Sequence, residues 1–216
     1  MDKREKAGKV LDILEKEFPN ATTALRFGNP LQLLIATILS AQATDKLVNQ
    51  VTESLFKKYR TAADFKGADP SELERDLSSI NFYRNKTKSV RGACAKIVEE
   101  FGGRVPETLE ELTTLPGVGR KTANIVLGNA FGKSALAVDT HVKRVAQRLG
   151  LTESDDPDRI EADLTAIIPP ERWTMTTHLF IHHGRKTCKA LRPECERCPI
   201  QAYSVYYRDI FLKKKK

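Results

Sequence analysis

The stretch that decides the fold is Leu115-Pro116-Gly117-Val118-Gly119-Arg120-Lys121-Thr122-Ala123. Before it, Thr108-Leu109-Glu110-Glu111 has the spacing of a helix N-terminal capping box. After it, apolar residues at helical spacing run from Arg120 to about Asn129. The stretch therefore predicts two short helices joined by a glycine hairpin.

The two glycines of this hairpin suit it to hold an anion. Gly117 and Gly119 allow a positive φ and a close approach of the backbone. Amides at the start of the second helix can then point at a phosphate, with the helix dipole adding to the attraction. An ordinary helix–helix turn is the alternative, and it would be the commoner outcome for a bare Gly-x-Gly. The longer string is more restrictive, so we predict DNA phosphate contacts at Gly117, Val118, Gly119 and Arg120.

The rest of the chain also has helical periodicity. Asp69-Pro70-Ser71-Glu72 and Asp156-Pro157 each offer an N-cap followed by a first-turn proline. No convincing strand pattern is present, and about ten helices fit the spacing of the apolar residues. Cys94 lies on the apolar side of one such helix and is predicted to be a buried small residue. The fold class predicted from these patterns is all-α.

Composition points to a polyanionic partner. The 216 residues include 36 Lys and Arg against 28 Asp and Glu, which gives a net charge of +8. The longest apolar stretch, around residues 31–39, is too short to span a bilayer, and the charged N-terminus does not have the pattern of a signal peptide. We therefore expect a cytoplasmic protein, associated with the nucleoid in a prokaryote.

Three separate segments resemble signatures of the endonuclease III family of helix-hairpin-helix DNA glycosylases. They are Asn29-Pro30-Leu31 through Gln42-Ala43-Thr44-Asp45, the hairpin with its following helix, and Val138-Asp139-Thr140-His141-Val142. The resemblance extends from about residue 10 to about residue 208. It implies a six-helix barrel domain over residues 23–133 that carries the hairpin. Residues 1–22 and 134–216 would form a discontinuous helical domain with a cysteine loop at 184–204, and DNA would bind in a cleft between the two lobes.

The resemblance assigns Lys121 and Asp139 to catalysis. Lys121 would attack C1′ of the damaged nucleotide and form a Schiff base, and the positive end of a helix dipole together with desolvation favours the neutral amine that this needs. Asp139 would accept a proton and stabilise positive charge on the sugar. Taken alone, Lys121 would be a solvated surface lysine. Asp139 also precedes an apolar helical pattern that ends at Gly150, so it is a candidate helix N-cap, and both roles can coexist.

Further DNA contacts follow from the same resemblance. Gln42 and Phe82 would fill the gap left when the base is flipped out of the duplex. The chain departs from the family at this place, because Asn81 stands where glycine is usual and Phe82 where leucine is frequent; a core aromatic is the alternative for Phe82. Arg84 and Lys86 are candidate phosphate contacts, or part of a solvated face.

A cysteine loop lies near the C-terminus. Cys188 is followed by six residues and Cys195, and then by two residues and Cys198. Family members with this loop have a fourth cysteine where this chain has Ser204, and the four thiolates hold a four-iron, four-sulfur (4Fe-4S) cluster. Basic residues of the loop would then face the DNA backbone: Arg185, Lys186, Lys189, Arg192 and Arg197.

Ser204 leaves the metal content open, because a serine hydroxyl is a poor ligand for a soft metal. A labile cluster with an alkoxide or water ligand, a three-iron cluster and no cluster all fit the sequence. Zinc held by the three cysteines with His182 or His183 is an alternative that ranks below iron. Either metal would be structural, and the reaction implies no catalytic divalent metal.

The function implied by the resemblance is bifunctional base-excision repair of double-stranded DNA by a monomer. The enzyme would remove oxidised or ring-saturated pyrimidines and cleave 3′ to the abasic site by β-elimination. Adenine-specific glycosylases differ, because they carry a catalytic glutamate where this chain has Ala36-Thr37, and they have a further C-terminal domain. The alternative from another class is a non-catalytic helix-hairpin-helix DNA-binding module, which explains the charge and the glycines but not Lys121 together with Asp139.

Overall fold

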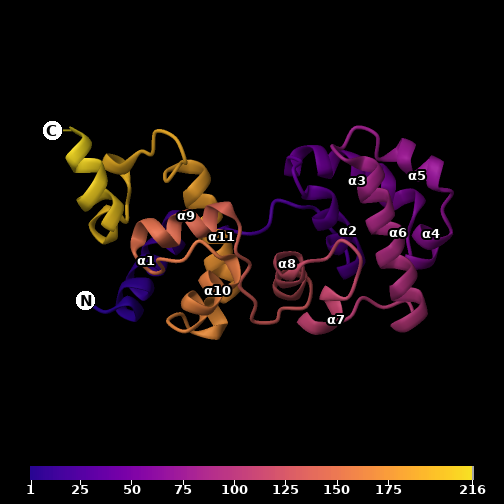
Figure 1. The fold of residues 1–216 in the computed structure, drawn as a ribbon, viewed down its shortest axis with the longest axis horizontal. Coiled ribbons are helices and arrows are strands. Elements are labelled where there is room, and N and C mark those ends of the chain that lie inside the picture. The colour runs from indigo at the N-terminus through magenta and orange to yellow at the C-terminus, as the bar shows by residue number, and fades with distance from the viewer. Residues whose placement is uncertain (216) are drawn as a thin grey trace. The chain divides into compact units, whose positions relative to one another are not determined.

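A computed structural model describes residues 1–215 and divides the chain into two compact units (Figure 1). Thr23–Lys133 form the unit that we call the hairpin lobe. Met1–Thr22 and Ser134–Lys216, of which Lys216 lies outside the described residues, form the terminal lobe. These bounds coincide with those expected from the sequence. The described residues are helical with no strand, so the all-α prediction is confirmed. None of their helices has the length and apolar character needed to span a membrane.

Seven helices make up the hairpin lobe in the described residues, where six were expected. They are α2 (Pro30–Ser40), α3 (Asp45–Lys58), α4 (Ala62–Gly67), α5 (Pro70–Asp76), α6 (Tyr83–Glu100), α7 (Leu109–Thr113) and α8 (Arg120–Ala130). The count rises because residues 61–76 form two short helices. A capping box at Thr61 starts α4, and Asp69 with Pro70 starts α5.

The terminal lobe contains both ends of the chain. Its α-helices are α1 (Lys3–Glu17), α9 (Thr140–Leu149), α10 (Pro157–Thr165) and α11 (Trp173–Lys186). Five short helical turns complete it: η1 (Pro170–Arg172), η2 (Cys195–Arg197), η3 (Gln201–Tyr203), η4 (Tyr207–Phe211) and η5 (Leu212–Lys215).

Side chains at the helix N-termini explain where several helices begin. The carboxylate of Asp69 accepts the N–H of Glu72, and that of Asp156 accepts the N–H of Arg159. Thr108 accepts the N–H of Glu111 at the start of α7. All three predicted helix starts are confirmed.

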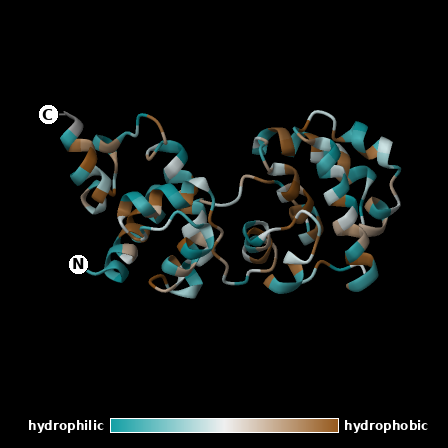
Figure 2. Cartoon of the chain, viewed as in Figure 1, coloured by the Kyte–Doolittle hydropathy of each residue, from teal (hydrophilic) through white to brown (hydrophobic). Residues whose placement is uncertain are grey.

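Helix α2 is the centre of the hairpin lobe. It is apolar nearly all round, and its residues 33–39 are all buried, as expected of a core helix (Figure 2). Helices α3, α6 and α8 contact it. Because α8 buries Ala123, Val126 and Leu127, its first turn is held in a fixed direction by the rest of the helix. Cys94 is buried in α6 as predicted, and burial raises the pKa of its thiol to about 12.

The terminal lobe has its own apolar core, to which α1, α9, α10 and α11 all contribute. Helix α1 buries Val10, Leu11 and Leu14, so the N-terminal segment is part of this core. Arg172, just before α11, pairs with Asp12 and Glu15 of α1 at 2.9 and 2.8 Å. Helix α9, which begins directly after Asp139, rests on the same core through Val142, Val145 and Leu149.

Candidate nucleic-acid interface and cysteine loop

The tip of the hairpin is fixed against α6. Gly117 has φ 77°, and a Cβ built there would lie 2.6 Å from Cβ and 2.7 Å from Oγ of Ser89. The N–H of Val118 donates to Leu115 O at 3.0 Å, and the Val118 side chain is buried. Val118 was predicted to contact phosphate, but its amide is used within the turn and its side chain anchors the hairpin. Val118 therefore supports the site by anchoring the hairpin that carries it.

Gly119 plays a different part from Gly117. It is the N-cap of α8 with φ −94°, a conformation open to any residue, and a Cβ there would meet no atom within 4 Å. The fold therefore does not require glycine at this position. The first N–H groups of an α-helix have no acceptor within the helix, so the start of α8 is a place where an anion that approaches over Gly119 can bind.

Lys121 is the second residue of α8, and its side chain is exposed. Arg120 beside it is exposed as well. The helix that carries both is anchored on α2 and α7, so the backbone under the Lys121 amine is rigid while the amine itself is accessible. An accessible amine at a helix N-terminus can act as a nucleophile toward an electrophilic carbon held next to it.

Two exposed residues of the hairpin lobe other than glycine have left-handed backbone, namely Gln42 with φ 54° and Phe82 with φ 59°. Neither is glycine, so each conformation carries a cost of about 1–2 kcal/mol that the surrounding structure must offset. Phe82 is 60 % exposed, so the core-aromatic alternative is wrong. An exposed aromatic ring and an exposed amide on strained, fixed loops can enter a base stack.

Lys86 is not a phosphate contact. Only 6 % of it is exposed, and its ammonium donates to Leu39 O at 2.9 Å and Ala41 O at 2.6 Å. Burial lowers its pKa. Its neighbour Arg84 is exposed and lies 3.8 Å from the Glu74 carboxylate, so Arg84 alone of this pair can reach a phosphate.

Asp139 is the N-cap of α9, as its position before the apolar pattern suggested. Its Oδ1 accepts the N–H groups of His141 and Val142, both at 2.8 Å. Both capping bonds go to one oxygen, and the residue is half-buried, so the carboxylate combines a fixed orientation with access to solvent. Gly150, with φ 69°, ends the same helix.

His141 and Arg144 support the Asp139 loop and were not identified from the sequence. Arg144 Nη2 lies 3.0 Å from His141 Nδ1 and donates to Gly184 O at 3.0 Å, while Nε donates to Cys188 O at 2.9 Å. Burial lowers the pKa of His141, so the ring is neutral and Nδ1 can accept from the guanidinium. A Cβ at Gly184 would lie 3.0 Å from His141. The signal for Arg144 in the sequence is the group of basic residues in α9, which contains Lys143, Arg144 and Arg148.

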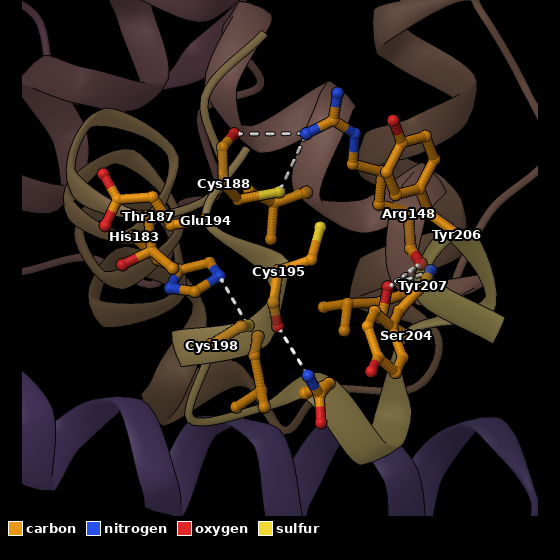
Figure 3. A pocket seen from close by; sticks show the side chains of 14 residues that line it. Arg148, His183, Thr187, Cys188, Glu194, Cys195, Cys198, Ser204, Tyr206 and Tyr207 are labelled. Atoms are coloured by element: carbon orange, nitrogen blue, oxygen red, sulfur yellow. Dashed lines mark hydrogen bonds between the residues drawn. The ribbon is translucent and has the colours of Figure 1, made fainter. Parts of the chain in front are cut away.

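Arg148 is the organising residue of the cysteine loop (Figure 3). Its guanidinium donates to Lys189 O at 2.8 Å, Ala190 O at 3.2 Å and the Cys188 sulfur at 3.3 Å. Its Cζ also lies 4.4 Å from the ring centroid of Tyr206. One arginine of α9 therefore holds the start of the loop by protein–protein hydrogen bonds.

The three cysteines of the loop line one cavity, and two of their sulfur atoms have contacts with other side chains. Figure 3 shows Cys188 directed to Arg148 and Cys198 directed to His183, whose Nε2 lies 3.6 Å from the Cys198 sulfur. Burial lowers the pKa of His183 to about 4 and raises that of Cys198 to about 11. His182 instead contacts Thr22 O and the Phe18 ring, away from the cysteines. Among residues 1–215, no set of three Cys, His, Asp or Glu side chains is arranged to hold a metal ion, so the zinc alternative is not supported.

Ser204 is already engaged by the protein. Its hydroxyl donates to Arg148 O at 3.1 Å and accepts the N–H of Tyr207 at 3.1 Å. Ser204 lines the same cavity as Cys188, Cys195 and Cys198. Three thiolates and a serine hydroxyl that is already hydrogen-bonded do not supply the four soft ligands of a 4Fe-4S cubane, and nothing in the chemistry below passes through such a cluster.

The basic residues predicted to face DNA all lie on the surface of the loop or the end of α11. Arg185, Arg192 and Arg197 are exposed. Lys186 pairs with Glu17 at 2.7 Å, and Lys189 pairs with Glu194 at 2.6 Å. Exposed pairs of this kind contribute little stability, so a phosphate can replace the carboxylate.

Comparison with known proteins identifies the family to which the chain belongs. Residues 35–170 match the family described as HhH-GPD superfamily base excision DNA repair protein. The endonuclease III of Synechocystis sp. is 52 % identical over 199 residues, which cover 92 % of this chain and 91 % of that protein. The endonuclease III of Bacillus subtilis is 46 % identical over 191 residues, covering 88 % and 87 %.

Two solved structures match over the full length of both chains. One is described as a non-covalent endonuclease III–DNA complex and the other as a trapped endonuclease III–DNA covalent intermediate. Each is 45 % identical to this chain, with a TM-score of 0.92.

The two hairpin glycines are expected to fail in different ways. Gly117→Ala should lower the free energy of unfolding by about 2–4 kcal/mol, because the new methyl group meets Ser89 and the backbone is left-handed. Gly119→Ala should cost less than about 1 kcal/mol but weaken binding to duplex DNA by about tenfold, because the methyl group stands where a phosphate would approach. Urea unfolding and fluorescence anisotropy measure the two effects. Equal losses of stability, or undiminished DNA binding by Gly119→Ala, would contradict this division.

The purified protein is expected to contain far less than four iron atoms per chain and to lack the visible absorbance band of an iron–sulfur cluster. Iron analysis and absorbance spectroscopy after anaerobic reconstitution with iron and sulfide test this. As a second readout, Arg148→Met should lower the unfolding midpoint more than Cys195→Ala does, because the guanidinium holds the loop. Four irons per chain with a cluster spectrum would show that the loop rearranges around a cluster.

Proposed function

The chain belongs to the endonuclease III family, within the HhH-GPD superfamily of base excision DNA repair proteins, and we propose that Lys121 is the amine with which it attacks damaged DNA. Members of this family are DNA glycosylases with abasic-site lyase activity, and so is this protein. The observation that carries the proposal for Lys121 is its exposed position in the first turn of α8, directly after the anchored hairpin.

In the proposed first step, the Lys121 amine gives up a proton and donates its electron pair to C1′ of the damaged nucleotide. A bond forms between Nζ and C1′, and the N-glycosidic bond breaks with its electron pair leaving on the base, which is then protonated. The deoxyribose ring opens to give a Schiff base between Nζ and C1′. Removal of a proton from C2′ then expels the 3′ phosphate, which is β-elimination, and water releases the amine.

We assign Asp139 the task of accepting the proton that the amine must lose and of stabilising positive charge on the sugar as the base leaves. Its support is the fixed carboxylate at the start of α9, where Oδ1 is held by two backbone N–H groups. His141 and Arg144 act behind it by holding the loop in place.

DNA binding rests on separate elements of the chain in this proposal. The amides at the start of α8 bind phosphate without reading sequence, and Arg84 and Arg120 add charge. Gln42 and Phe82 fill the space vacated by the flipped base. The basic surface of the cysteine loop, including Arg185 and Arg192, adds backbone contacts that weaken as salt rises.

The family typically carries a 4Fe-4S cluster next to this loop. We propose that this chain dispenses with it, because Ser204 is used as a cap and Arg148 holds the backbone of the loop. The chemistry at Lys121 is unaffected, because the amine and the carboxylate belong to other elements.

The substrate that we propose is duplex DNA that contains oxidised or ring-saturated pyrimidines or abasic sites. Buried Ala36 and Thr37 stand where adenine-specific enzymes carry a catalytic carboxylate, which supports pyrimidine lesions. We propose that the protein acts as a monomer on the nucleoid in the cytoplasm, which its net charge of +8 and its bacterial relatives support.

Borohydride trapping tests the role of Lys121. Wild-type protein mixed with duplex DNA bearing an abasic site should become covalently linked to the DNA strand when the Schiff base is reduced, and Lys121→Ala should not. Lys46→Ala is a matched control, because Lys46 is an exposed lysine at the second position of α3 in the same lobe. A persistent adduct in Lys121→Ala, or none in the wild type, refutes the assignment. An adduct lost in both variants would show that charge, and not the nucleophile, was removed.

Asp139→Asn separates catalysis from helix capping. Asparagine caps nearly as well as aspartate, so the unfolding midpoint should change little. Base removal should slow on the order of 10²–10⁴-fold, because the amide cannot accept a proton. Single-turnover kinetics and thermal unfolding of the same samples measure both. Unchanged turnover would leave Asp139 with a capping role only.

A further inference from the structure

Lys86 and Asn81 connect the two strained loops of the hairpin lobe. We propose that they are positioning residues, which hold Gln42 and Phe82 ready to enter the DNA base stack. The inference rests on the proposed function of Gln42 and Phe82 and adds the element that keeps them in place.

The first observation that supports the proposal is the hydrogen bonding of the backbone carbonyls where α2 ends. Leu39 O and Ala41 O accept from the Lys86 ammonium at 2.9 and 2.6 Å. Gln42 O accepts from the Asn81 side chain at 3.3 Å, and Ser40 O accepts the N–H of Ala43 at 3.1 Å. All four consecutive carbonyls are thus bonded, and three of them are held by side chains of the segment that also carries Phe82.

The second support is the chemistry of the Lys86 site. An ammonium at a helix C-terminus is favoured by the dipole, and bonds to a charged donor are stronger than neutral ones. At 6 % exposure it cannot exchange its partners for water. The contact is therefore a rigid connection between the end of α2 and the first turn of α6, at sequence positions 47 residues apart.

The third observation is the backbone strain at the two residues that this connection keeps in place. Gln42 and Phe82 are the non-glycine residues of the hairpin lobe with positive φ, and they lie on the two sides of the Asn81–Gln42 bond. Such conformations persist where surrounding contacts determine them, and they concentrate at functional sites. Both side chains are exposed, so packing within the lobe does not explain the strained backbone.

The test is a double-mutant cycle of Lys86→Met with Gln42→Ala. Lys86→Met keeps the length of the side chain but removes the donors. The variant should lower the single-turnover rate of base removal by about tenfold, because a charge-assisted contact is lost. The rate of cleavage at a preformed abasic site should change less, because no base has to be extruded. In the Gln42→Ala background, Lys86→Met should add little, because both changes act through one element. Lys96→Met is the control on the same helix, since its ammonium pairs with Glu100 of that helix near the surface.

Asn81→Ala is the second variant in this test, because Asn81 is exposed and its substitution does not disturb the core. Its effect on base removal should also be non-additive with that of Gln42→Ala, but it should be smaller than the effect of Lys86→Met. Full additivity in both cycles would overturn the proposal, and so would an equal fall in base removal and in abasic-site cleavage. A Lys86→Met protein that no longer folds would also overturn it, since Lys86 would then support the lobe as a whole. Failure of the proposed function is distinguishable, because wild-type protein would then give no borohydride adduct.

Discussion

The close approach of Gly117 to Ser89 is the contact on which the site depends. It places the hairpin tip directly on α6, so the start of α8 has one position relative to the helix that carries Phe82 and Lys86. The buried residues of α8 then fix the direction of its first turn, where Lys121 is exposed. A catalytic amine needs this combination, because a nucleophile gains from fixed geometry while its tip must reach the substrate.

Several functional groups in this chain have a second, structural task. Asp139 caps α9, and Ser204 accepts the N–H of Tyr207 in the turn that follows it. Lys86 binds the carbonyls at the end of α2, and Arg148 binds the backbone of the cysteine loop. In each case a polar group that would cost free energy if left unpaired is satisfied by the element that it positions. Loss of the fourth cysteine is therefore compatible with an ordered loop.

Local features of the fold were predictable from the sequence, and long-range ones were not. The caps at Asp69, Thr108 and Asp139 and the hairpin itself follow from neighbouring residues, so the helices were placed correctly. Lys86 was misassigned because a lysine in a charged segment is usually solvated, and its acceptors lie 45 and 47 residues away. Val118 was misassigned because the motif does not say which amide the turn itself uses. The roles of Lys121 and Gln42 came from resemblance to a family, since neither residue type is informative alone.

The central claim is that the amine at the start of α8 forms the covalent bond to DNA. The most direct measurement is peptide mapping by tandem mass spectrometry of the borohydride-reduced adduct, after digestion of both protein and DNA. The account predicts a deoxyribose remnant on Nζ of Lys121. A remnant on another lysine, or on the N-terminal amine, would contradict it.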